Sequence, residues 1–234
     1  LTIRGWEQTS GSAGTKVDTS SNGGITAFSS ATDVVDVSVT AVNDAPVLDN
    51  TGTMTLTTIT EDATTNSGNT VSSIISSAGG DRITDVDSSA VEGIAITATT
   101  NGTGTWEYST NSGSSWTAVG TVSNSSALLL RSTDLVRFVP NGQNATAGDI
   151  TFRAWDQSTG SFGTKVDTST NGTTTAFSTS TEVASITVTA VNDAPVLSDT
   201  ALSITVAEDA GVPAGVVGSL ISAFTGGVSD VDSG

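Results

Sequence analysis

The stretch ASITVTAVNDAPVL, from Ala184 to Leu197, joins a strand pattern to a candidate domain junction. Apolar residues at Ile186, Val188 and Ala190 alternate with Ser and Thr. That alternation predicts a half-buried β-strand with one wet Ser/Thr face. Asn-Asp-Ala-Pro follows the strand directly. We therefore interpret the segment as the end of one β-domain and the start of the link to the next.

The same sequence recurs in phase along the chain. AVNDAPVL occupies Ala41–Leu48 and again Ala190–Leu197, an offset of 190 − 41 = 149 residues. Over the residues up to Leu48 the two copies align without a gap, and about two-thirds of the positions are identical. Further on, ITEDA (59–63) returns as VAEDA and ITDVDS (83–88) as VSDVDS. This regularity indicates a tandem repeat. Enzymes are seldom built from such arrays.

The repeat phase divides the chain into three pieces. Residues 1–43 form the C-terminal part of a preceding repeat, 44–192 a complete repeat, and 193–234 the N-terminal part of a following repeat. Because the chain starts and stops inside a repeat, we expect it to be a segment of a longer repetitive polypeptide. Alternatively, neighbouring subunits could complete each other's end repeats by strand addition. The two end pieces together, however, lack the middle of the repeat.

Short β-strands dominate the expected secondary structure. The alternating or β-branched runs are Met54–Thr60, Ile94–Thr99, Leu135–Val139, Ile150–Trp155 and Ala184–Ala190. Asn-Gly pairs at Asn101, Asn141 and Asn171 signal turns. The best helical fragment, near Val71–Ala78, is short and rich in Ser. The pattern predicts an all-β fold of Ig-like β-sandwich type.

The composition narrows the class of function. Seven Lys and Arg stand against 24 Asp and Glu, which gives a formal charge of −17. Nucleic acid and anionic lipid repel such a surface, so we expect no nucleic-acid partner, and cations are the natural ligands. No apolar run is long enough to cross a membrane, so we expect no membrane insertion of this segment. The chain has no Cys and no His, which excludes disulfides, Cys or His zinc sites and histidine catalysis.

Oxygen-bearing side chains recur at fixed places in the repeat. They form a Glu-Asp pair after the first strand, an Asp-Val-Asp loop, an acid after a Trp, and the Asn-Asp of the junction. Asp-x-Asp in a turn can aim both carboxylates at one hard cation, and Ca²⁺ accepts about 6–8 oxygens in irregular geometry. The candidate ligands are Asn43, Asp44, Glu61, Asp85, Asp87, Asp156, Asn192, Asp193, Glu208, Asp230 and Asp232. The alternative is that Asn-Asp-Ala-Pro is only a Pro-stiffened linker.

These motifs resemble those of bacterial cadherin-like tandem repeats, which build large calcium-dependent surface adhesins. Asn192–Pro195 is similar to the cadherin linker Asp-x-Asn-Asp-Asn-Ala-Pro. Glu61 resembles the strand-end Glu of cadherin domains, and Asp85 with Asp87 resembles their Asp-x-Asp motif. Asp156 resembles the Asp near the penultimate strand of such domains. The resemblance covers most of the chain and implies tandem cadherin-like β-sandwiches.

The chain departs from the cadherin pattern at two places. Ala190 stands where the linker has its first Asp, and the Asn after Asn-Asp is missing. The Leu-Asp-Arg-Glu motif has no good match, and Arg131–Asp134 comes nearest. The resemblance therefore implies fewer protein ligands for calcium than a cadherin linker offers.

In that family calcium lies between consecutive domains, so the resemblance implies two junction sites. The first would use Asn43, Asp44, Asp85, Asp87 and Asp156, with a Glu from the preceding repeat. The second would use Glu61, Asn192, Asp193, Asp230 and Asp232, with an Asp from the following repeat, and Glu208 holds the Glu61 position of that repeat. The implied function is an extracellular structural or adhesive array at the bacterial cell surface: a fibre, filament or adhesin stalk. Its partners would be neighbouring repeats of the same chain or polymer, and surface glycan or other cells.

A second hypothesis concerns the segment STNSGSSW, Ser109–Trp116. It resembles the Asp-box hairpin Ser-x-Asp-x-Gly-x-x-Trp, with Asn111 in the Asp place. Trp106, Tyr108 and Trp116 could form a carbohydrate-binding surface, or they could stabilise the hairpin by cross-strand aromatic pairing. The second interpretation is favoured because so small an aromatic set rarely makes a binding site. An enzyme, such as a glycosidase with two carboxylates, is not expected, since each repeat would have to keep its own site.

Overall fold

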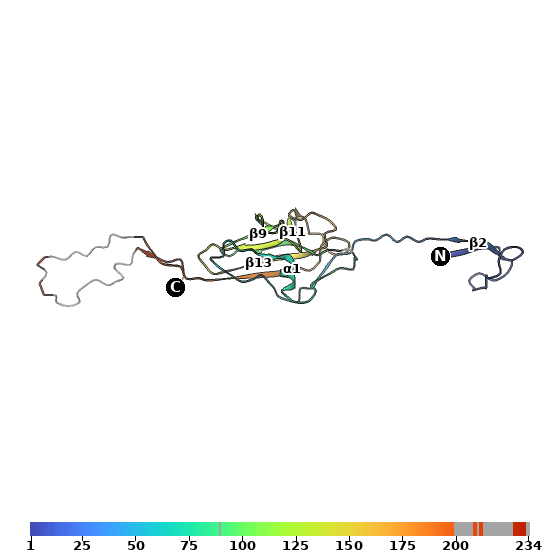
Figure 1. Ribbon diagram of the computed structural model, residues 1–234, viewed down its shortest axis with the longest axis horizontal. Coiled ribbons are helices and arrows are strands. Elements are labelled where there is room, and N and C mark those ends of the chain that lie inside the picture. The colour runs from blue at the N-terminus through green and yellow to red at the C-terminus, as the bar shows by residue number, and fades with distance from the viewer. Residues whose placement is uncertain (89, 199–207, 210, 213–226, 233–234) are drawn as a thin grey trace. The chain divides into compact units, whose positions relative to one another are not determined.

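The computed structural model describes residues 1–88, 90–198, 208–209, 211–212 and 227–232 (Figure 1). The chain divides into two compact units, Leu1–Val42 and Asn43–Gly234. Strands make up 36% of the residues and helix 3%, which confirms the predicted all-β class. Among the described residues, no helix combines the length and the apolar character needed to cross a membrane.

The first unit is a two-stranded hairpin with a long loop. Strand β1 (Thr2–Trp6) pairs antiparallel with β2 (Phe28–Val34), and a register shift falls between Arg4 and Trp6. The Arg4 guanidinium donates to the carbonyls of Ser29 and Ser30 at 2.9 and 2.7 Å. The indole N–H of Trp6 donates to the carbonyl of Ser10 at 2.7 Å and closes the loop.

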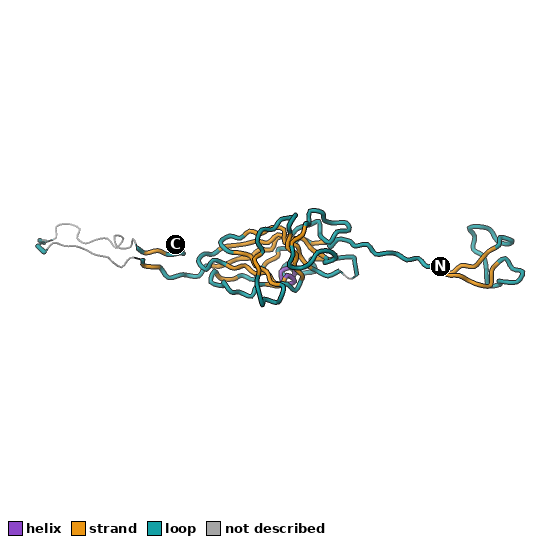
Figure 2. Tube along the Cα trace, turned by 90° about the horizontal axis from the view of Figure 1, so that it is seen from above, coloured by secondary structure: helices purple, strands orange, loops and turns teal. Residues whose placement is uncertain are grey.

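The second unit contains a seven-stranded sheet. Its strands, in spatial order, are β14 (Lys165–Val166), β11 (Ala127–Arg131), β8 (Gly93–Thr100), β13 (Thr146–Trp155), β15 (Glu182–Thr189) and β4 (Met54–Thr55), with β5 (Ile59–Thr60) also paired to β15. All of these pairs are antiparallel except those of β15 with β4 and β5, which are parallel. The strands are orange in Figure 2.

A second, four-stranded sheet lies in the same unit. Its spatial order is β10 (Thr117–Ala118), β9 (Thr105–Ser109), β12 (Leu135–Val139) and β6 (Asn69–Thr70). Helix α1 (Val71–Ser76) follows β6, and the Thr70 hydroxyl caps it by accepting from the Ser73 amide at 3.1 Å. Two short pairs are also present among the described residues of the unit: β3 (Val47–Leu48) with β7 (Ile83–Thr84), and β16 (Val196–Leu197) with β17 (Val228–Ser229).

The two sheets share one apolar core. Trp106 and Phe138 of the four-stranded sheet are buried in the same cluster as Ile96 and Phe152 of the seven-stranded sheet. The rings of Trp106 and Phe138 meet edge to face, with centroids 5.1 Å apart. This burial follows from strand alternation, because every second residue of β12 and β13 points inward.

The other face of the seven-stranded sheet is covered by residues 156–181, a long loop that also contains the short edge strand β14. Ala176 and Phe177 of this loop pack against Leu129 and Trp155 in a second buried cluster. The Trp155 indole N–H donates to the Thr159 carbonyl at 2.8 Å, as Trp6 does to Ser10 in the first unit. The loop is therefore a packed layer of the fold, and the equivalent hydrogen bond is made in both copies of the repeat.

The strand predictions differ from the structure mainly at Met54–Thr60. Leu135–Val139 is confirmed, and Ile94–Thr99 and Ile150–Trp155 lie inside longer strands. Met54–Thr60 instead splits into β4 and β5, because the Thr57 amide leaves the sheet and donates to the Asn69 side chain at 3.1 Å. The fragment near Val71–Ala78 forms the single helix among the described residues.

Candidate metal centre at the linker

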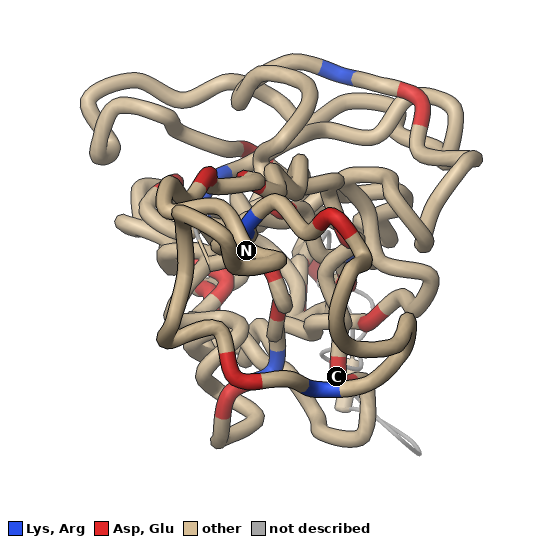
Figure 3. The backbone as a smooth tube through the Cα atoms, turned by 90° about the vertical axis from the view of Figure 1, so that its right-hand side faces the viewer, with Lys and Arg blue, Asp and Glu red and all other residues tan. Residues whose placement is uncertain are grey.

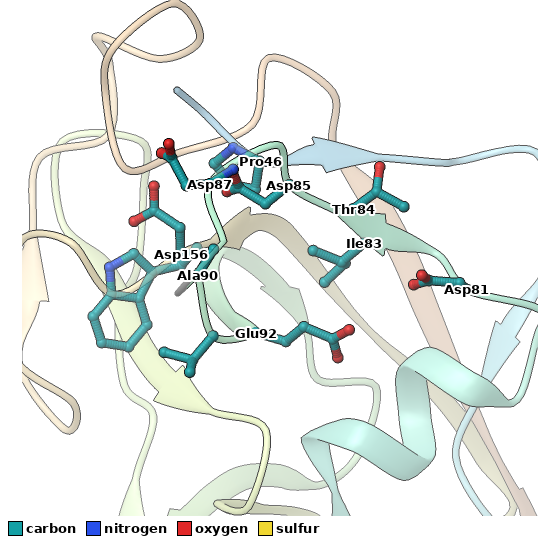
Figure 4. A pocket seen from close by; sticks show the side chains of 11 residues that line it. Pro46, Asp81, Ile83, Thr84, Asp85, Asp87, Ala90, Glu92 and Asp156 are labelled. Carbon is teal, nitrogen blue, oxygen red and sulfur yellow. The ribbon is translucent and has the colours of Figure 1, made fainter. Parts of the chain in front are cut away.

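Three ligands predicted for the first junction, Asp85, Asp87 and Asp156, line one cavity at one end of the second unit, and Asn43 contacts Asp156. Their carboxylate oxygens do not all come within 4.8 Å of one another, so these three do not form a close group like the one at the other end. The Asn43 side-chain amide donates to Asp156 Oδ2 at 2.9 Å across 113 residues of sequence. The amide of Asp44 donates to Asp87 Oδ2 at 2.8 Å, and the amide of Asp87 donates to Asp85 Oδ1 at 2.9 Å. Asp85, Asp87 and Asp156 line one cavity of about 230 Å³ together with Pro46 (Figure 4).

The hydrogen bonds at this end leave one buried carboxylate oxygen without a partner among the described residues. Asp156 accepts from Asn43 at Oδ2 and from the Ser158 amide at Oδ1, 2.7 Å away. Asp85 Oδ2, in contrast, is enclosed and has no hydrogen-bond partner among the described residues. A buried oxygen of this kind is costly unless a donor or a cation meets it.

A second group of carboxylates lies at the other end of the sheets. Glu61, Asp193 and Asp232 each offer an oxygen within 4.8 Å of the other two. Glu61 is fully buried; its Oε1 accepts from the Val191 amide at 2.7 Å, and its Oε2 is enclosed without a partner among the described residues. Asp193 Oδ2 is enclosed and unpaired in the same way. Two unused oxygens therefore belong to one three-carboxylate group.

The two ends repeat the same pair of hydrogen bonds from backbone amides to Asp carboxylates. The Asp193 amide donates to Asp232 Oδ2 at 2.7 Å, which matches the bond from Asp44 to Asp87. The Asp232 amide donates to Asp230 Oδ1 at 3.0 Å, which matches the bond from Asp87 to Asp85. In each case the linker binds the Asp-x-Asp turn of the repeat that it enters, so the turn and the linker form one structural element.

Three further predicted ligands, Asp230, Asn192 and Glu208, are not part of the three-carboxylate group, and Asp230 instead accepts from the Asp232 amide. Glu208 and its neighbour Asp209 are exposed in a turn, and no described carboxylate group includes them. The Asn192 side chain donates to the carbonyl of Asp193 at 2.9 Å and does not contact the three carboxylates through a hydrogen bond among the described residues. Glu208 therefore offers a matched exposed position for comparison with Glu61.

Basic side chains do not neutralise the clustered carboxylates. Acidic residues outnumber basic ones along the chain (Figure 3). The ion pairs among the described residues join Arg82 to Asp49, Arg131 to Asp134 and Arg137 to Glu107, at 2.8, 2.7 and 2.6 Å. None of these six residues is a candidate ligand, and the Arg131–Asp134 segment is a structural pair. The negative charge at the linkers is thus left without a protein counter-charge in the described part of the chain.

The environment of Asp193 favours its neutral form. Removal from water raises the pKa of the Asp193 carboxyl above the ordinary value of 3.8, and the negative charges of Asp232, Asp62, Glu61 and Asp230 raise it further. A divalent cation would reverse this effect, because it favours the ionised form of every carboxylate around it.

The raised pKa of Asp193 predicts a pH dependence in the absence of metal. The folded state holds the Asp193 proton more tightly than the unfolded state, so the stabilising contribution is complete below pH 3.8 and is lost as pH rises through the folded pKa. In chelator, the melting temperature of the parent minus that of Asp193→Asn should therefore fall between acid and neutral pH. A difference that stays constant with pH would contradict this prediction.

The donor set fits calcium better than other common metals. All the donors are carboxylate or amide oxygens, whereas zinc and copper sites favour His and Cys, which the chain lacks. Two oxygens bound to one Ca²⁺ at about 2.3–2.6 Å lie at most about 5 Å apart, and the three carboxylates meet that limit of separation. Mg²⁺ demands a tighter octahedron and keeps more of its water.

The aromatic residues in and beside the Ser109–Trp116 hairpin make contacts within the fold. Trp106 is only 3% exposed, and its indole N–H donates to the Thr100 carbonyl at 2.9 Å. The Tyr108 hydroxyl donates to the Gly163 carbonyl at 3.3 Å, and the Arg137 guanidinium lies 4.0 Å from the ring centroid of Trp116. Trp106 is thus removed from any surface platform, and the observed cross-strand pair of Trp106 with Phe138 agrees with the stabilising role.

The sequence pattern missed several groups around the linkers. The carbonyls of Thr173 and Thr175 accept from the first linker, and Gln143 and Asn144 line the cavity beside Glu61. Backbone carbonyls carry no side-chain signature. The Asn-Gly pair at Asn171 marks a turn there, but it gives no sign of what the turn contacts.

Compared with models of protein families, with curated proteins and with solved structures, the chain matches none. The functional assignment therefore rests on the residues and geometry of this chain.

Proposed function

We propose that the chain is a segment of a tandem β-sandwich array whose junctions bind Ca²⁺ and are stiffened by it. The observation that carries the proposal is the buried Glu61 carboxylate, whose Oε2 has no hydrogen-bond partner among the described residues and lies in one group with Asp193 and Asp232. An ionised carboxylate taken out of water costs several kcal/mol unless a counter-charge compensates it. A calcium ion would supply that counter-charge.

The two ends of the second unit suggest how a full junction is composed. Glu61 belongs to the repeat that precedes the second linker, whereas Asp230 and Asp232 belong to the repeat that follows it. At the first linker, the following repeat supplies Asp85, Asp87 and Asp156. In a continuous array, each junction would combine a Glu of one repeat with the Asp side chains of the next, so that bound calcium would link the two domains.

The array is proposed to be extracellular, where millimolar calcium can fill sites of modest affinity. Its role would be mechanical: a fibre, filament or adhesin stalk at a bacterial cell surface, with neighbouring repeats as the principal partners. A calcium-dependent stiffness suits such a role, because like charges at an empty junction repel and allow it to bend.

Calcium titration by calorimetry tests the proposal. We expect the chain to bind Ca²⁺, and Glu61→Gln to lose binding at the second linker, since the substitution removes one charged ligand at nearly constant shape. Glu208→Gln, the same change at an exposed position, should bind as the parent does. Small-angle scattering in calcium and in chelator then reports the stiffening. Absence of calcium binding, or identical scattering in both conditions, would refute the proposal.

A further inference from the structure

The loop 156–181 makes contacts with the first linker that do not need a metal ion. The Ala45 amide donates to the Thr173 carbonyl at 2.8 Å, and the Asn43 side chain donates to the Thr175 carbonyl at 3.2 Å. We propose that this loop is a metal-independent clamp that fixes the incoming Asn-Asp-Ala-Pro linker to the repeat that follows it. This inference does not rest on calcium binding.

The clamp is held in place by the fold beneath it. The amide of Asp156 donates to the Ala176 carbonyl at 3.2 Å, and the amide of Ser178 donates to the Ala154 carbonyl at 3.1 Å. Phe177 between these bonds is 6% exposed and packs on the seven-stranded sheet. Before the acceptors, the amide of Thr168 donates to the Asn124 carbonyl at 2.6 Å, so the acceptor carbonyls are carried by a segment anchored on both sides, which lowers the entropy lost when a linker binds.

The turn that presents the acceptors is built in the same way in both copies of the repeat. Thr173 has a φ of 52°, which is unusual for a β-branched residue, and Gly24 at the equivalent position has a φ of 58°. The closing bonds also match: the Gly172 amide donates to the Phe177 carbonyl at 2.8 Å, and Gly23 donates to Phe28 at 2.7 Å. The left-handed turn is thus a fixed part of the repeat, and Thr173 adopts it because its surroundings require it.

The upstream side of the linker is held by the other repeat. Glu61 Oε1 accepts from the Val191 amide at 2.7 Å, so the residue before Asn192 is tied to the preceding domain. The clamp holds the equivalent of Asn192 and the residues after it, starting at Asn43. In a junction with both contacts, the backbone between the Val and the Asn would be the one part of the linker held by neither domain. We infer that a calcium-free array bends at this Val–Asn step.

Amide hydrogen exchange of the full chain in chelator tests the clamp directly. Ala45 and Ala194 have the same neighbours, Asn-Asp before and Pro after, so their intrinsic exchange rates match. Ala45 has a carbonyl partner, whereas the described residues provide none for Ala194. We expect the Ala45 amide to exchange at least about tenfold more slowly than the Ala194 amide. Equal exchange at the two alanines would overturn the inference.

Paired proline variants give an independent test. Ala45→Pro removes the donor, and Ala194→Pro makes the same change in the second linker. In chelator, Ala45→Pro should speed exchange of the Gly172–Phe177 amides and lower the melting temperature, whereas Ala194→Pro should do neither. Ala45→Gly keeps the amide and should retain the protection of the loop. An equal response of the loop to both proline variants would also overturn the inference, while leaving the calcium proposal intact.

Discussion

Glu61→Gln should melt no lower than the parent chain in chelator, but at a lower temperature than the parent when calcium is added. In chelator we expect the variant to melt at the same temperature as the parent or higher, because it removes one negative charge from a group of three carboxylates. The Gln side-chain oxygen can still accept from the Val191 amide, so the linker contact at Glu61 is preserved.

With calcium at about 100 times its dissociation constant, the parent should gain about 2.7 kcal/mol per site from binding to the folded state alone. For a domain of this size that corresponds to a rise of about 5–10 °C in melting temperature. Glu61→Gln should lose most of this gain at the second linker. Thermal unfolding in calcium and in chelator measures both quantities.

Glu208→Gln is the control for charge and composition, because Glu208 is exposed and outside the carboxylate groups of the described residues. Its melting curves should follow those of the parent in both conditions. If Glu61→Gln and Glu208→Gln behave alike in calcium, the buried carboxylate has no special part in metal binding, and the proposed site is wrong.

Phe138→Ala should destabilise the second unit strongly. The Phe138 side chain is fully buried between the two sheets and packs edge to face against Trp106. Removing such a ring leaves a cavity that the surrounding strands fill only in part, at a cost of about 3–5 kcal/mol. Urea denaturation in chelator measures this loss free of any calcium effect.

Phe162→Ala provides the comparison for Phe138→Ala. Phe162 is 45% exposed, and the Arg131 guanidinium lies 3.4 Å from its ring centroid. The substitution should cost no more than about 1 kcal/mol, the usual value of an exposed cation–π contact. A loss at Phe162 as large as that at Phe138 would show that the shared core does not dominate stability.

The sequence was most informative where a pattern repeats and the chemistry lies in side chains. Strand alternation predicted Leu135–Val139 residue for residue, and the recurrence of Asp-Val-Asp pointed to turns that the structure places against the linkers. The contact of Asn43 with Asp156 spans 113 residues, yet both positions were selected because they recur in the repeat. Their role as metal ligands stays a prediction.

Other features depend on the tertiary structure and have no local signature. Met54–Thr60 has an unbroken strand pattern, but Asn69 competes for the Thr57 amide and divides the strand. Trp106 is buried because Phe138 lies opposite it on the neighbouring strand. The acceptors at Thr173 and Thr175 are backbone carbonyls, which every residue type provides, so no residue pattern could have singled them out.

The lengths of the edge strands have a consequence for a chain that contains a tandem sequence repeat. Both sheets of the second unit end in strands of two residues, β14 with β4 and β5 in one and β10 with β6 in the other, whereas their central strands have five to ten. Neighbouring copies on one polypeptide meet at very high local concentration, where a long open edge would invite pairing with the wrong copy during folding. Short edges offer few amide and carbonyl groups to a stray strand. The short edge strands thus limit mispairing between neighbouring copies of the repeat.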